Sequence, residues 1–157
     1  MTSTMICDTS QSIVHNILYA SQLISRAMDR RFRVSGLTYN HVSVLLILWE
    51  KGPLKQKDLV GHMAITQTAI TAIISRMTAI DLVLQSPNPG DGRSVIISLT
   101  DKSRRKMNTI WSELKIAESD TLKGFTDPER DNLLNLVKMI VSNIWEPQPT
   151  RRKINRG

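Results

Sequence analysis

Residues 55–99 read KQKDLVGHMAITQTAITAIISRMTAIDLVLQSPNPGDGRSVIISL, and the order of the patterns within them decides the fold. Two short helical patterns come first, and a hairpin signal follows directly, with Asp91-Gly92-Arg93 at its tip. Two helices followed by a β hairpin are typical of a winged helix-turn-helix. We therefore expect a mainly α-helical chain with a small β wing that binds DNA.

The first helical pattern covers residues 54–63 and should form about two turns. Its apolar residues recur at helical spacing, at Leu54, Leu59 and Met63. The hydroxyl of Thr66 can cap a second helix, because it can accept from a backbone N–H two or three residues later. The second helix is therefore predicted to begin near Gln67.

The second helix has one apolar face and one polar face. The apolar stripe consists of Ile70, Ile73, Ile74 and Met77. The polar face has no carboxylate, which suits contact with an anionic duplex, because an acidic side chain would repel phosphates. The residues predicted to contact DNA on this helix are Thr66, Gln67, Thr68, Thr71, Ser75 and Arg76. A helix face that simply meets water is the alternative.

The hairpin is predicted from two strand-like runs, residues 83–86 and 94–99, the second of which is rich in β-branched residues. Four residues between them indicate a turn: Pro87, Pro89, Gly90 and Gly92. Such a hairpin is stable only when it packs on helices, which leaves its tip free. Arg93 can then enter a minor groove or bind a phosphate, while Asp91 orients Arg93 or caps the turn.

These pieces together resemble the MarR (multiple-antibiotic-resistance regulator) family. The matching pieces are Asp58-Leu59-Val60, Thr66-Gln67-Thr68-Ala69-Ile70-Thr71, Arg76-Met77, Leu82-Val83, Asp91-Gly92-Arg93 and Leu99-Thr100. The resemblance implies a homodimeric transcriptional regulator, usually a repressor. It also implies that the second helix enters the major groove of double-stranded DNA and that the wing touches the minor groove.

The chain departs from the family pattern at four places. The family commonly has Gly at Asp81, a basic residue near Gln85-Ser86, Arg at Gly92 and Gly at Ser103. Two basic positions of the wing are thereby lost. We expect a wing that still contacts DNA, but more weakly.

Length and composition indicate one domain. A chain of 157 residues with 41% hydrophobic content can bury a real core. No apolar run approaches the roughly 18 residues of a membrane span, and residues 1–7 lack the pattern of a signal peptide, so we expect a cytoplasmic protein. The single cysteine, Cys7, excludes an internal disulfide and is expected to be an unreactive thiol.

The net charge of +7 is unevenly distributed. Residues 51–106 carry nine basic and four acidic groups, a net of +5, whereas residues 107–150 carry four basic and seven acidic groups, a net of −3. Attraction to phosphate explains why positive charge gathers on the predicted DNA-binding region. Residues 147–157 form a basic tail that either adds phosphate contacts or only aids solubility; its charges are Arg151, Arg152, Lys153 and Arg156.

The regions flanking the winged helix-turn-helix of residues 37–100 are predicted to be dimerisation helices, over residues 9–35 and 101–146. The first has an apolar stripe and is ended by Gly36. A further helix is capped by Thr38, runs through Trp49 and is closed by Gly52-Pro53. The helix beyond Thr100 ends near Gly124. The apolar stripe of the first helix is Ile13, Ile17, Leu18 and Ile24.

The last helix is opened by a capping box, Thr126-Asp127-Pro128-Glu129, and stopped by Pro147. These helices outnumber what one small core can cover. A symmetric homodimer would bury their apolar stripes and place two recognition helices one DNA turn apart, ~34–36 Å. A monomer whose terminal helices merely cover the core is the alternative.

Enzyme chemistry is not indicated. His15, His41 and His62 fall on three predicted helices without a neighbour at metal-binding spacing, so we expect packing or surface roles and neither metal nor cofactor. The residue pattern contains no phosphate-binding glycine loop and no nucleophile elbow.

The family resemblance also implies a small-molecule effector. Members often bind phenolic or other aromatic acids between the dimer helices and the DNA-binding region. Tyr39 follows the Leu-Thr that opens the second family helix, and Tyr19 can face the same crevice, so these are the predicted ligand contacts. Plain packing of both tyrosines is the alternative.

Two other classes of function compete with a transcriptional regulator. A basic RNA-binding or nucleoid-associated protein would lack operator specificity. A redox or metabolite sensor would act mainly through another protein.

Overall fold

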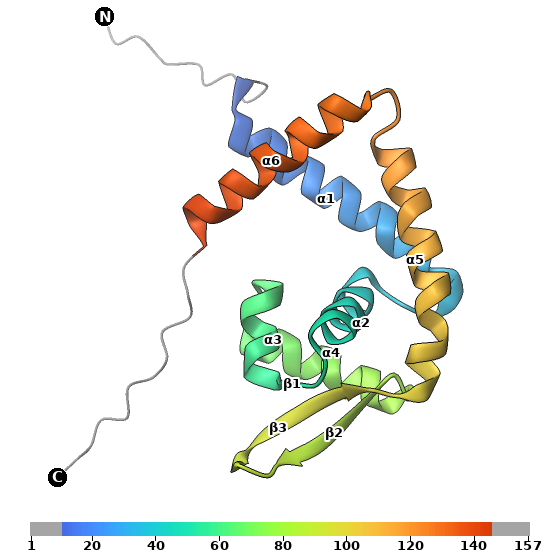
Figure 1. Cartoon of the computed structure of the whole chain (residues 1–157), viewed down its shortest axis with the longest axis vertical. Helices are drawn as coiled ribbons and strands as arrows, with labels where there is room; N and C mark the ends of the chain where they lie inside the picture. The colour runs from blue at the N-terminus through green and yellow to red at the C-terminus, as the bar shows by residue number, and fades with distance from the viewer. Residues whose placement is uncertain (1–10, 146–157) are drawn as a thin grey trace, which may run out of the picture.

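The computed structural model describes residues 11–145, and for Arg93 the backbone alone. It is mainly α-helical with one small antiparallel sheet, as predicted (Figure 1). The chain runs through α1 (Ile13–Phe32), a 3₁₀ turn (Arg33–Ser35), α2 (Tyr39–Lys51), β1 (Leu54–Lys55), α3 (Gln56–Met63), α4 (Gln67–Ala79), β2 (Val83–Asn88), β3 (Asp91–Leu99), α5 (Asp101–Thr121) and α6 (Asp127–Ile144).

The core lies where α2, α3 and α4 pack against the base of the sheet. Leu45 of α2, Leu59 of α3 and Ile97 of β3 are fully buried there. The predicted apolar stripe of α4 is also buried, as Ile70, Ile73, Ile74 and Met77. Burial of one complete face fixes how α4 is rotated about its axis, and so fixes which side chains face solvent.

The prediction that a helix begins at Leu54 was wrong. Leu54 and Lys55 form a two-residue strand that pairs with Ile97 and Ile96, so the sheet order is β1-β3-β2. The backbone leaves α2 at Gly52, whose φ of 76° suits glycine, and enters an extended conformation. The extended residues there form backbone hydrogen bonds with the edge of β3 that would otherwise be open, and an unpaired backbone N–H or C=O costs free energy when it is removed from water.

The wing is longer than predicted. Strand β2 continues through Pro87 to Asn88, and β3 already begins at Asp91. Proline is tolerated because β2 is an edge strand, where a missing N–H costs no ladder bond. The Asn88 side chain closes the tip: its Nδ2 donates to Ser94 Oγ (2.8 Å) and its Oδ1 accepts from Gly90 N (3.2 Å).

The helix starts follow the predicted caps. Thr38 Oγ1 accepts from His41 N (3.3 Å), and Thr66 Oγ1 accepts from Ala69 N (3.2 Å). The Glu129 carboxylate accepts from Thr126 N (2.8 Å), which confirms the capping box at α6. Helix α1 starts later than the predicted region 9–35, because Ser12 is its N-cap, whereas Gly36 takes the predicted left-handed conformation after the 3₁₀ turn. Thr9, Cys7 and the tail of residues 147–157 lie outside the described residues.

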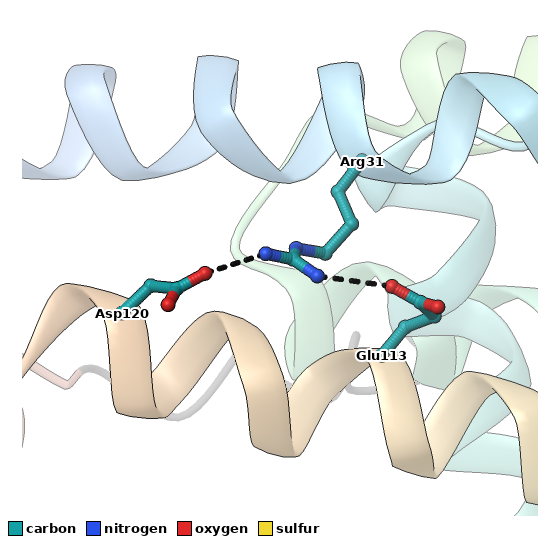
Figure 2. A network of polar contacts seen from close by, with 3 residues as sticks. All are labelled: Arg31, Glu113 and Asp120. Carbon is teal, nitrogen blue, oxygen red and sulfur yellow. Dashed lines mark hydrogen bonds and ion pairs between the residues drawn. The ribbon is translucent and has the colours of Figure 1, made fainter.

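An ion-pair network joins α1 to α5 (Figure 2). Arg31 donates to Glu113 Oε2 (3.1 Å) and to Asp120 Oδ2 (2.6 Å), two carboxylates that lie two helical turns apart on α5. The guanidinium thus holds the C-terminal end of α1 against α5. Within residues 11–145, no helix is both long and apolar enough to span a membrane.

Candidate nucleic-acid interface

Helix α4 presents its polar face to solvent. All six side chains predicted to contact DNA on this helix are exposed: Thr66, Gln67, Thr68, Thr71, Ser75 and Arg76. Positions 68, 71 and 75 follow helical spacing, so they share one side of α4. The structure thus brings these residues together on one accessible surface.

The N-terminal end of α4 is open at that surface. Thr66 uses its hydroxyl to satisfy Ala69 N, and no acidic residue lies in the first turn of the helix. The positive end of the helix dipole therefore faces solvent without a neutralising carboxylate on its own first turn. Such an end favours an anionic group such as a phosphate.

Two glutamines from neighbouring elements bind threonines of α4. Gln56 Nε2, at the start of α3, donates to Thr71 Oγ1 (2.8 Å). Gln85 Nε2, on β2, donates to Thr78 Oγ1 (2.9 Å). These two contacts tie the polar side of α4 to α3 at one end and to the wing at the other.

A cleft runs beside the first turn of α4 toward the wing. Its lining comes from the start of α3, from α4 and from β3, and includes Lys55, Gln56, Lys57, Gln67, Asp91, Ser94 and Val95. Lys57 is exposed and Lys55 is half-buried, so both ammonium groups can meet an incoming phosphate. Sequence reasoning named Gln67 and Asp91 but missed these lysines, although the excess of basic residues over 51–106 was the signal.

The comparisons with known proteins bear on this geometry. The MarR family profile matches residues 37–95, which include α2, α3, α4 and most of the wing. Residues 37–95 of the chain thus match a MarR-family domain.

Relatives extend that likeness over nearly the whole chain. The chain is 28% identical to the HTH-type transcriptional regulator MgrA of Staphylococcus aureus over 144 residues, 91% of this chain and 95% of MgrA. It is 25% identical to the HTH-type transcriptional repressor NicR of Pseudomonas putida over 136 residues, 87% of this chain and 86% of NicR. These relatives are regulators by name.

A solved structure shares the fold of this chain. BpsR of Bordetella bronchiseptica, whose DNA binding is regulated by 6-hydroxynicotinic acid, matches with a TM-score of 0.77 and 25% identity. The match covers 83% of this chain and 94% of BpsR. The likeness therefore includes helices on both sides of the winged helix-turn-helix.

His41 belongs to the capping box of α2 and feels the charge of Arg76 on α4. Its ring is buried, and its Nδ1 accepts a hydrogen bond from Thr38 N (3.3 Å), which a protonated imidazole could not do. Burial lowers the pKa of His41, and the Arg76 guanidinium lowers the pKa further, while Asp29 opposes both. His41 is a packed, neutral residue, so of the two roles that the sequence left open, packing or surface, the structure gives it the packing role.

The two tyrosines lie on different helices. Tyr19 is exposed on α1, and Tyr39 is the first residue of α2, where its backbone N donates to Asp29 Oδ1 (2.7 Å). A small cavity of about 60 Å³ between the end of α1 and α5 is lined by other residues, among them Phe32, Leu37 and Ile110. Ligand binding by Tyr19 and Tyr39 stays a prediction.

The three histidines lie on α1, α2 and α3, as predicted. Among the described residues, no three His, Cys, Asp or Glu side chains gather into a group that could hold a metal ion. Arg93 lies on β3, two residues after Asp91, and its contact with DNA stays a prediction.

Proposed function

We propose that the chain is a sequence-specific transcriptional regulator that binds double-stranded DNA through α4 and the wing. The observation that carries this proposal is the exposed polar face of α4, which has no carboxylate and borders a cleft lined by Lys55 and Lys57. Small polar side chains can reach base edges in the major groove, while the lysines neutralise phosphates. The match of residues 37–95 to the MarR family profile supports the same assignment.

We propose further that it acts as a homodimer on an inverted repeat. None of the side chains of α6 is buried, and the exposed apolar residues of α1 and α6 are too many for a monomer in water. They are Ile13, Val14, Ile17, Leu18, Leu23 and Ile24 on α1 and Leu133, Leu134, Leu136, Val137, Met139, Val141 and Ile144 on α6. A two-fold axis through these helices would pair two α4 helices with two half-sites.

Repression relieved by an aromatic acid is the mode of action we favour. NicR is a repressor by name, and the DNA binding of BpsR responds to 6-hydroxynicotinic acid. Neither Tyr19 nor Tyr39 lines the small cavity between α1 and α5, so the ligand site we propose lies outside it, between the dimer helices and the DNA-binding region. Tyr19 and Tyr39 are the residues we propose for ligand contact.

Selection of bound sequences from a random DNA pool tests the function directly. We expect an inverted repeat whose half-sites lie about one helical turn apart. Gln67→Ala should relax the preference at particular base pairs of the selected site, because base contacts specify and phosphate contacts do not. Equal losses on the selected site and on random duplex would remove Gln67 from readout. A pool without enrichment would favour a non-specific nucleic-acid binder.

The effector is tested by adding 6-hydroxynicotinic acid and a panel of phenolic acids to the complex with the selected duplex. We expect release by at least one of these acids, and a weaker response in the Tyr39→Phe variant, which keeps the ring and loses the hydroxyl. Release that is equal in both proteins would exclude the Tyr39 hydroxyl from the ligand site.

A further inference from the structure

The side chain of Thr71 has already used its hydroxyl within the protein. Thr71 Oγ1 donates to Gln67 O (2.8 Å), four residues earlier on α4, and accepts from Gln56 Nε2 (2.8 Å). A hydroxyl has one proton, so Thr71 has no donor left for a base edge. Without breaking these bonds, Thr71 can still offer a base its methyl group and, as an acceptor, the second lone pair of its hydroxyl oxygen.

The hydrogen bond from Gln56 fixes the orientation of the Thr71 side chain. A threonine in a helix divides between two side-chain rotamers, because its hydroxyl can bond to the carbonyl of the preceding turn. Gln56 adds a partner from a different helix, and Gln56 is half-buried while Thr71 is exposed. The glutamine therefore selects one orientation of Thr71 before any DNA is bound.

We propose that Thr71 reads its base through its methyl group, by contact with the C5 methyl of a thymine in the major groove, and that Gln56 is the positioning residue that fixes Thr71. The proposal rests on the proposed function, because it needs α4 in the major groove. Thymine alone among the four bases presents a methyl there, so a methyl-to-methyl contact carries sequence information.

The test uses the full-length protein and the inverted repeat selected from the random pool. Each thymine of one half-site is replaced in turn by deoxyuridine, which pairs like thymine but lacks the methyl. One such replacement should weaken binding by the wild-type protein about fourfold, the effect of one buried CH₂-sized group. Thr71→Val keeps the methyl and one dominant rotamer, so it should retain this discrimination. Thr71→Ser keeps the hydroxyl bonds and loses the methyl, so it should bind both duplexes equally.

Gln56→Met tests the positioning role. This substitution removes the amide and keeps a side chain of similar length. We expect the ratio of the affinities for the thymine and deoxyuridine duplexes, at the base position that Thr71 reads, to fall toward one. Combining Gln56→Met with Thr71→Val should restore the ratio, because valine needs no hydrogen-bond partner to hold its rotamer. A merely structural role for Gln56 would instead lower affinity for all duplexes and would not be rescued by valine.

Thr78 is the matched control. Its Oγ1 makes the same pair of bonds, to Ile74 O (2.9 Å) and from Gln85 Nε2 (2.9 Å), but it lies two turns further along α4, about 10 Å from Thr71 along the axis. Thr78→Ser should leave the ratio unchanged. Three results would overturn the proposal. The first is that deoxyuridine weakens binding at no position, and the second is that Thr71→Ser keeps the discrimination between thymine and deoxyuridine while Thr71→Val loses it. The third is that Thr78→Ser lowers this discrimination as much as Thr71→Ser does. If the random pool yields no inverted repeat, the proposed function is overturned as well. The three results above are measured on a selected repeat, so they overturn the methyl contact alone.

Discussion

Arg93 is the basic residue of the wing on which contact with DNA depends. It stands on β3 next to Gly92, where the family commonly has a second arginine, so the adjacent residue cannot take over its charge. We expect Arg93→Ala to weaken operator binding by about 1–3 kcal/mol while the protein stays folded. Fluorescence anisotropy on the selected duplex measures this loss, and circular dichroism checks the fold. An unchanged affinity would remove the wing from the mechanism.

His41 makes the stability of the fold depend on pH. Burial and Arg76 lower its pKa below the unfolded value of 6.5, so the unfolded chain takes up the proton first as pH falls. The contribution of neutral His41 is complete above pH 6.5 and is lost as pH falls through its folded-state pKa. For one proton the slope is at most about 1.4 kcal/mol per pH unit.

Urea unfolding between pH 8 and pH 5 measures this effect. The His41→Asn variant offers an oxygen to Thr38 N but does not titrate, so its unfolding free energy should fall less across this range. Parallel curves for the two proteins would show that His41 is not the group responsible.

The junction between α4 and β2 carries backbone strain. Asp81 has a φ of 58°, the left-handed region that disfavours side chains, and its carbonyl accepts from Thr100 Oγ1 (2.9 Å). Asp81→Gly should therefore raise the free energy of unfolding by about 0.5–1 kcal/mol, net of the greater freedom of glycine in the unfolded chain. Asp81→Val should lower it, since β-branched residues suit this region least. Urea midpoints of the three proteins provide the comparison.

The start of α3 supplies charge rather than sequence preference. Replacing Lys55 and Lys57 by Gln should weaken binding to selected and random duplexes alike. Each lost phosphate contact should reduce the slope of log affinity against log salt by about 0.9. Lys123→Gln, in the exposed turn that follows α5, is the control and should leave the slope unchanged. A changed base preference in the lysine variant would contradict a pure phosphate role.

At the scale of the whole molecule, the apolar faces of α1 and α6 require a partner. Removing all residues after Thr126 should expose the surfaces that α6 covers in a dimer and yield monomer or aggregate. Val137→Glu tests the same face with the full chain, since Val137 is exposed on α6. Analytical ultracentrifugation reports the oligomeric state. A folded, operator-binding monomer in either case would refute the homodimer.

Local signals were sufficient for most elements. The predicted starts of α2, α4 and α6 agree with the structure, because an N-cap residue bonds to a backbone group within three residues of itself. The caps are Thr38, Thr66 and Thr126. The buried face of α4 was also predictable, because helical periodicity is written in the chain itself. The exposed polar face of the candidate site followed from the same periodicity.

Contacts between distant residues decided the rest. Leu54 has the spacing of a helix, yet it became a strand because β3, some forty residues later, offers an edge to pair with. The Gln56–Thr71 hydrogen bond and the Arg31 ion pairs join different helices, and no local sequence pattern predicts such contacts between distant residues. Backbone caps depend on neighbours in the chain, whereas edge pairing and side-chain partners depend on which elements the packed core brings together.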